Sequence, residues 1–163
     1  WAVLRFVDGR RTVAEIAAEA GLSVDEAIHR IEKLVEMGLV DVNISEPVRK
    51  VAKAYEEALN EYLKDLRDLL GYDVVKAALS RAVASWGQPW LNQREEGGIE
   101  VREADRLAWL HTPNEVSEMF KSFFSTLSQE VKPLMGVLAS DIIAKVQAAM
   151  RTRHGEEFRK FGA

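Results

Sequence analysis

The residues that most often carry chemistry are few in this chain and are not spaced for it. The three histidines, His29, His111 and His154, are not spaced with one another or with a carboxylate as a helical metal pair would be. The chain has no cysteine, which excludes thiolate catalysis, disulfides and cysteine zinc sites. No serine lies in a nucleophile elbow, and no glycine-rich segment is typical of a phosphate loop. We therefore expect no enzyme, metal or cofactor, unless folding brings a carboxylate pair together.

The composition is that of a globular protein. Of the 163 residues, 47% are hydrophobic and 29% are charged, enough for one domain or two small ones. The formal net charge of -4 argues against a dedicated nucleic-acid binder, because such proteins are usually basic. No apolar run approaches the roughly 18 residues that cross a bilayer, so we expect no transmembrane segment and a cytoplasmic location. Because the chain starts at Trp1, inside an apolar segment and without a methionine, we expect a piece of a longer protein.

Residues 2–42 carry start and stop signals for three short helices. Two capping boxes, each a hydroxyl residue followed three positions later by a glutamate, begin the second and third helices: Thr12 with Glu15, and Ser23 with Glu26. Glycines that favour the left-handed conformation end them, at Gly21 and Gly38. An apolar segment, residues 2–7, predicts the first helix, and Leu39, Val40 and Val42 predict the start of a strand. The helical period places Val35 on the buried face of the third helix. The order is that of a winged helix-turn-helix.

A more specific pattern runs through the same segment. It consists of Asp-Gly, two basic residues and Thr-Val, then Gly-Leu-Ser, then Met-Gly-Leu-Val, and here it occupies Asp8–Val13, Gly21–Ser23 and Met37–Val40. In this pattern the segment resembles the winged-helix family, and in particular the modules at the ends of bacterial PATAN-domain signalling proteins. The resemblance covers about the first quarter of the chain, residues 1–44. It implies a recognition module whose partner is either DNA or protein.

The charge of the predicted third helix decides between those partners. A helix that reads DNA presents arginine, lysine, asparagine or glutamine to the bases. Between Asp25 and Met37 there are two bases, Arg30 and Lys33, against four acids, and no basic wing loop follows. We therefore favour a protein-facing or structural role over DNA binding. A DNA-binding form would use Arg10, Arg11, Arg30 and Lys33.

The rest of the chain predicts a helical bundle. Residues 45–70 form one helix, capped by Ser45, with apolar side chains at alternating spacings of three and four: Val48, Ala52, Tyr55, Leu59, Tyr62, Leu66 and Leu69. Since Leu63 and Leu70 widen this seam, we favour a core-facing helix over an intermolecular coiled coil. Within residues 71–163 we expect a helix through Val83, an extended piece at Ile99 and Val101, a short helix near Leu107, a helix capped by Thr112 and a last helix through Met150. The predicted fold is mostly α: a winged-helix module (1–44), a long connecting helix (45–70) and a helical C-terminal domain (71–163).

Two further groups are candidate contact residues. Three of the four tryptophans, Trp86, Trp90 and Trp109, lie in one loop-rich stretch, where they would suit a partner hot spot or plug the core, and we favour the plug. Basic residues gather on the long helix and in the tail, where an acidic partner, a membrane surface or nucleic acid would dock: Arg49, Lys50, Lys53, Arg151 and Arg153. For the tail the alternative is ordinary complementarity to a helix dipole.

These patterns together favour a non-catalytic module for protein interaction or regulation, in a prokaryotic signalling protein. The alternative is a DNA-binding transcriptional regulator that uses the winged helix. A homodimer, through the region of Trp86 and Trp90 or through the third helix of the module, is left open.

Overall fold

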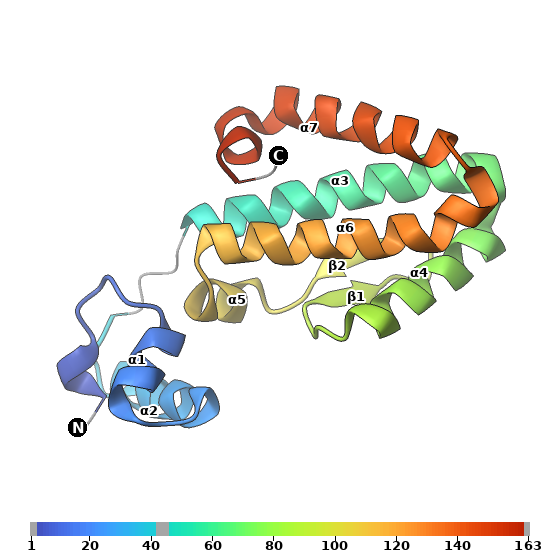
Figure 1. Cartoon of the computed structure of the whole chain (residues 1–163). Helices are drawn as coiled ribbons and strands as arrows, with labels where there is room; N and C mark the ends of the chain where they lie inside the picture. The colour runs from blue at the N-terminus through green and yellow to red at the C-terminus, as the bar shows by residue number, and fades with distance from the viewer. Residues whose placement is uncertain (1–2, 42–45, 162–163) are drawn as a thin grey trace.

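The fold is mostly helical and is built around two hydrophobic cores (Figure 1). The computed structural model describes residues 3–41 and 46–161, with the side chains of Ala139 and of residues 156–161 excepted. The N-terminal module contains a 3-10 turn and two helices: η1 (Leu4–Phe6), α1 (Val13–Ala20) and α2 (Val24–Glu36). The bundle contains five helices and a hairpin: α3 (Glu46–Leu70), α4 (Tyr72–Trp86), β1 (Leu91–Gln93), β2 (Ile99–Val101), α5 (Ala104–Leu110), α6 (Pro113–Met135) and α7 (Leu138–Phe161).

The capping boxes of the module form as the sequence predicts. The Thr12 hydroxyl accepts from the Glu15 amide at 3.3 Å, and the Glu15 carboxylate accepts from the Thr12 amide at 2.7 Å. Ser23 and Glu26 make the same exchange at the start of α2. Gly21 ends α1 with a positive φ of 66°, which glycine adopts without steric cost. The ends at which α1 and α2 meet are therefore stabilised by local hydrogen bonds.

Two predicted elements of the module are wrong. The described part of the expected first helix, residues 3–7, holds only the 3-10 turn Leu4–Phe6. Asp8 then accepts hydrogen bonds from the amides of Arg10 and Arg11, which turns the chain toward α1. Leu39–Asp41 forms no strand, because no strand among the described residues lies beside it to pair with. Val42 and the expected cap Ser45 lie outside the described residues.

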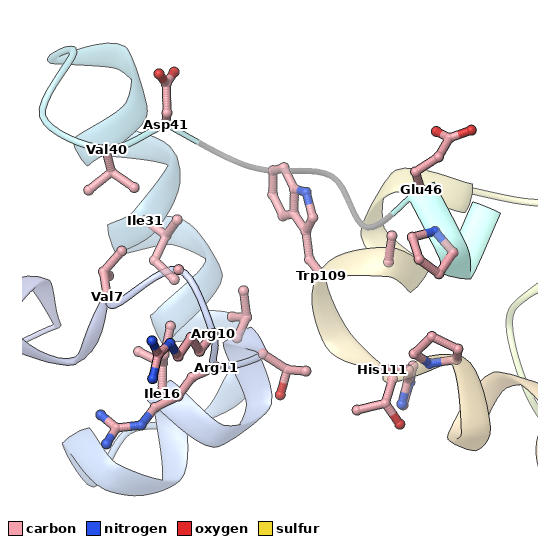
Figure 2. Close-up of a pocket in the computed structure, with 17 residues that line it drawn as sticks. Val7, Arg10, Arg11, Ile16, Ile31, Val40, Asp41, Glu46, Trp109 and His111 are labelled. Atoms are coloured by element: carbon pink, nitrogen blue, oxygen red, sulfur yellow. The ribbon is translucent and has the colours of Figure 1, made fainter. Parts of the chain in front are cut away.

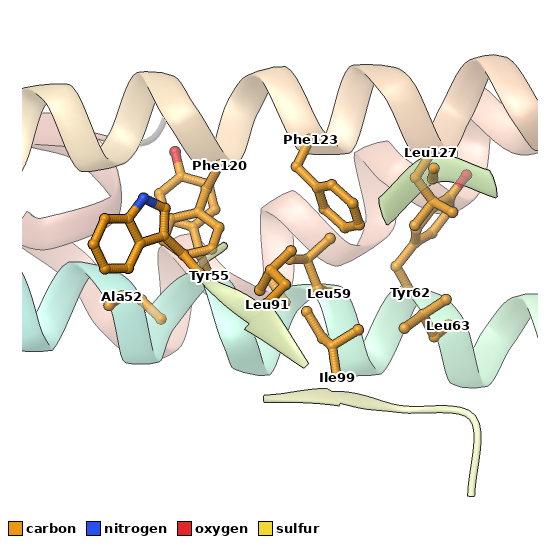
Figure 3. Close-up of a cluster of buried hydrophobic side chains, with 14 of the residues drawn as sticks. Ala52, Tyr55, Leu59, Tyr62, Leu63, Leu91, Ile99, Phe120, Phe123 and Leu127 are labelled. Atoms are coloured by element: carbon orange, nitrogen blue, oxygen red, sulfur yellow. The ribbon is translucent and has the colours of Figure 1, made fainter. Parts of the chain in front are cut away.

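Helix α3 is the centre of the bundle and contacts α4, α5, α6, α7 and β2. Figure 3 shows side chains of α3 facing those of α6 and of the hairpin. Tyr55 stacks on Phe120 with ring centroids 5.4 Å apart, and its hydroxyl hydrogen bonds to the buried Ser117 at 2.9 Å. The seam packs inside the chain, as favoured, except that Leu69 is 59% exposed.

The β-hairpin is held on α3 by hydrogen bonds between α3 side chains and the edge of β2 that does not pair with β1. Leu91 of β1 lies opposite Val101 of β2 in an antiparallel register. The Asn60 side chain accepts from the Ile99 amide and donates to the Ile99 carbonyl, both at 2.9 Å, and Glu56 accepts from the Val101 amide at 2.7 Å. A Cβ at Gly98 would lie 2.8 Å from Asn60 Oδ1, so this close approach requires glycine.

We predict that core truncations will destabilise the chain as their burial implies. Leu34, Leu59, Leu66 and Phe123 are all buried, and replacing any one by alanine removes packed apolar surface and leaves a cavity. Each change should lower the free energy of unfolding, measured by chemical denaturation, by about 2–5 kcal/mol. Leu69→Ala is the matched control and should cost under about 0.5 kcal/mol. Equal losses at Leu69 and Leu66 would contradict this packing.

A second prediction concerns Asn60. Asn60→Leu keeps the size of the side chain but leaves the amide and carbonyl of Ile99 without their partners in a largely buried setting. We expect the free energy of unfolding to fall by about 1–3 kcal/mol for each lost partner. The control is Asn92→Leu, because Asn92 is exposed on β1 and its side chain bonds only to Glu100 among the residues that the structure describes. A loss at Asn92 as large as that at Asn60 would rule out this role.

Candidate functional site

The short helix α5 joins the two cores. Leu107 and Ala108 are buried in the bundle core, whereas Trp109 packs against the core of the module and Leu110 contacts both. Because neighbouring residues of a helix point in different directions, one turn of α5 serves both sides. The position of the module on the bundle therefore depends on this turn.

The polar contacts across the same joint are weak. Arg106 Nη2 lies 3.1 Å from Asp25 Oδ1 of α2, but the Asp25 side chain is 86% exposed. An exposed pair of this kind contributes at most about 1 kcal/mol. On the bundle side, Arg49 of α3 hydrogen bonds to Asp105 and ties α5 to its own unit. Contact between the two units consequently rests on Trp109 and Leu110.

A cleft of about 540 Å³ lies on one side of Trp109. Figure 2 shows Arg10, Arg11, Ile16 and Ile31 on the module side of this cleft, and Trp109 and His111 on the bundle side. Its apolar wall includes residues of the module core, Val13, Ile16 and Ile31. They border the cleft because the described part of the module supplies no strand to cover them. We call this space the joint cleft.

The basic side chains around the joint cleft differ in whether they have a partner within the chain. Arg11 Nε lies 3.6 Å from Asp8, and backbone hydrogen bonds from Arg10 and Arg11 hold the pKa of Asp8 below its ordinary value. The Arg10 guanidinium makes no ion pair or hydrogen bond within the described part of the chain. His111 Nδ1 lies 3.6 Å from Glu115, and its ring meets Trp90 edge-on. Arg10 is thus the cation of this cleft that is free to meet another molecule.

Trp109 also leaves a hydrogen bond unmade. Its indole Nε1 is buried and has no acceptor among the residues that the structure describes. An indole N–H usually finds a partner when it is buried. One buried hydrogen-bond donor is therefore left without a described acceptor where the two units meet.

A second cleft, on the other side of Trp109, is acidic. It is lined by Ile28 and by Asp25, His29, Glu32, Glu103, Asp105 and Arg106. Residues 25, 29 and 32 lie on one face of α2, so this face is turned toward α5. Arg30 and Lys33 are exposed, line neither cleft, and form no direct ion pair among the described residues. The exposed side of α2 is therefore divided into an acidic stripe and a stripe with two bases.

The tryptophans do not form one exposed surface. Trp90 is only 7% exposed and belongs to the bundle core. Trp86 is half-buried, with ring centroids 6.2 Å from Phe120 and 5.1 Å from Phe123. Trp90 therefore packs as the core plug that we favoured, and Trp86 packs partly against the aromatic side chains of α6. Partner contact through these two residues stays a prediction. Trp109 alone of the three lies at a boundary between units.

The predicted basic residues are dispersed and partly occupied. Arg49 pairs with Asp105, whereas Lys50, Lys53 and Arg151 are exposed. Arg153 lies 2.9 Å from Glu61, and Lys145 lies 2.8 Å from Asp65, whose hydrogen bond raises the pKa of Lys145. Together with a 2.7 Å contact between His154 and Glu57, these contacts fasten α7 to an acidic stripe of α3 with a four-residue spacing. Arg153 therefore has a structural partner inside the chain.

Three exposed apolar side chains near the end of α2 were not expected from the sequence. Val35, Met37 and Leu39, at the end of α2 and just beyond it, are 37%, 65% and 46% exposed. The helical period placed Val35 in the core, and Leu39 was expected in a strand. Both predictions fail because the described residues supply no wing to pack on this end of α2. We call these three residues the α2-end patch.

Other kinds of site are absent from the described part of the chain. It contains no group of three or more histidine, aspartate or glutamate side chains placed to hold a metal ion. Within the same residues, no helix combines the length and apolar character needed to cross a membrane.

Comparison with protein-family models, with curated proteins and with solved structures finds no match to this chain. Its relation to winged-helix proteins therefore stays a resemblance of residues 1–44. The clefts beside Trp109 and the α2-end patch are the features from which a function can be argued.

Proposed function

We propose that the chain is a non-catalytic interaction and regulatory module of a cytoplasmic prokaryotic signalling protein, and that its N-terminal module binds a protein partner. The α2-end patch is the observation that carries this proposal. Its three large apolar side chains lie within five positions of one another and are all exposed. Grouped apolar exposure of this kind marks protein contact surfaces more often than isolated exposed residues do.

The electrostatics of α2 support a protein partner over DNA. A duplex that approached the acidic stripe would bring its phosphates toward Asp25 and Glu32, with Glu103 and Asp105 of α5 across the second cleft. Binding to DNA gains much of its affinity from neutralised phosphates, and this face offers little neutralisation. A protein partner with an apolar contact surface would bind at the α2-end patch without bringing negative charge toward these acids.

A DNA-binding regulator is the second candidate. It is supported by Arg30 and Lys33, which are exposed on α2 and have no direct ion pair among the described residues. Arg10 and Arg11 would have to act with them, but those two line the joint cleft, which Arg30 and Lys33 do not. The four bases therefore do not line a common cleft.

The regulatory part of the proposal follows from the joint at α5. One turn of helix and an exposed ion pair connect the module to the bundle. Contacts this limited open at low free-energy cost compared with unfolding of either unit. A signal that alters the bundle or the joint would then change how the module is presented.

We predict that the α2-end patch will contact a partner directly. A photo-crosslinking amino acid at Met37 or Leu39, in cells that produce the chain, should give one discrete protein adduct. The same amino acid at Lys64, which is exposed on α3, is the control and should give none. Met37→Asp should remove the adduct formed at Leu39, because a charge in a buried apolar contact is unfavourable. Adducts that are equal at Lys64 and Leu39 would contradict the proposal.

A further prediction separates the two candidates. Duplex DNA titrated against the chain and followed by fluorescence anisotropy should bind weakly at roughly 50 mM salt and not measurably at roughly 200 mM salt. Sequence-selective, sub-micromolar binding at the higher salt, lost in Arg30→Glu and Lys33→Glu, would establish the DNA-binding regulator instead.

A further inference from the structure

The joint cleft has the size and lining of a small-molecule site. Its volume of about 540 Å³ lies in the range of ligand pockets, roughly 300–1,000 Å³. Ile16 and Ile31 of the module and Trp109 of α5 provide apolar surface from two sides (Figure 2). An apolar body would therefore be covered by both units at once.

The polar groups of the cleft are sorted by position. Arg10, Arg11 and His111 lie toward one end, whereas Asp41 and Glu46 lie at the other, with carboxylates that point away from the cleft (Figure 2). Of the three basic groups, only Arg10 has no side-chain partner among the described residues. A single free guanidinium suits a single negative charge, and the two carboxylates disfavour a polyphosphate.

Trp109 adds an independent observation. Its buried indole N–H has no acceptor in the described part of the chain, although the ring lines the cleft. A ligand oxygen that entered beside the ring, with a small shift of the indole, would supply that acceptor. The cleft thus combines an apolar wall and one free cation, and a buried donor without a described acceptor lies in the Trp109 ring that lines it.

We propose that the joint cleft binds a small amphipathic anion, an aromatic or aliphatic body that carries one carboxylate or sulfonate. The body packs against Trp109 and the exposed side of the module core, and the anionic head meets Arg10. Because the lining comes from both units, the bound anion holds the module on α5. This coupling rests on the regulatory function proposed above, whereas the binding does not.

Two matched fluorescent probes test the binding. Anilinonaphthalene sulfonate has the proposed chemistry, and phenylnaphthylamine has the same aromatic body without the charge. We expect the sulfonate to bind with one-to-one stoichiometry and to bind about tenfold more weakly to Arg10→Gln, since a charge-assisted hydrogen bond is lost. The uncharged probe should bind both proteins within about twofold of each other. Arg10 is exposed, so the variant should keep the native circular dichroism spectrum.

Two control variants locate the probe. Arg30→Gln removes an exposed arginine outside both clefts, and Leu138→Ser removes an exposed apolar residue at the far end of the bundle. Neither should change binding of the sulfonate. If Leu138→Ser abolishes binding, or if Arg10→Gln weakens both probes equally, the anion site is overturned.

The coupling has its own measurement. The chain has no cysteine, so spin labels at Lys33→Cys on α2 and Lys64→Cys on α3 report one distance between the units. The saturating sulfonate should narrow this distance distribution, and Trp109→Ala should broaden it. Tight binding with an unchanged distribution would overturn the coupling and leave the anion site standing. The crosslinks at Met37 test the proposed function separately.

Discussion

The buried face of α3 is the constraint on which the other elements of the bundle depend. Helices α4, α5, α6 and α7 and strand β2 all contact it, so its apolar seam positions each of them. The large side chains of α3 and α6 interleave along this face, and Tyr55 stacks on Phe120. Because these rings are fully covered, the seam is not available for a coiled coil with a second chain. Any assembly of this protein must use another surface.

The polar side chains of the same helix also have partners within the chain. Glu56 and Asn60 pair with the backbone of β2, and Glu57, Glu61 and Asp65 face the bases of α7. The four-residue spacing of the second set follows the turn of the helix, so one stripe of α3 meets one stripe of α7. The basic tail residue Arg153 thus finds its partner within the chain. A charged cluster that a sequence suggests as a docking site can instead form ion pairs within the chain, as Arg153 does with Glu61.

The features that could be predicted from the sequence are those with local causes. The capping boxes at Thr12, Ser23 and Thr112 form because the serine or threonine and the glutamate lie within one helical turn. The predicted strand at Leu39 and the predicted burial of Val35 failed because both depend on a wing that the described residues do not form. The joint cleft could not be foreseen either, because residues 10, 31 and 109 meet only through the position of α5. Sequence period identifies a face but does not tell what covers it.

The joint between module and bundle differs in kind from the core beside it. The bundle core extends along the chain from Val48 to Met150, whereas the module core has few buried residues and is covered by Phe6 and other module side chains together with Trp109 and Leu110 of α5. A core this small gains much of its cover from the neighbouring unit, yet the cover is partial and leaves clefts on both sides of Trp109. Completing that cover with a ligand or a partner stabilises the docked arrangement without any change inside the bundle. The regulation that we propose has its physical basis in this incompletely closed joint, because the free energy of binding would act on the contacts between the two units.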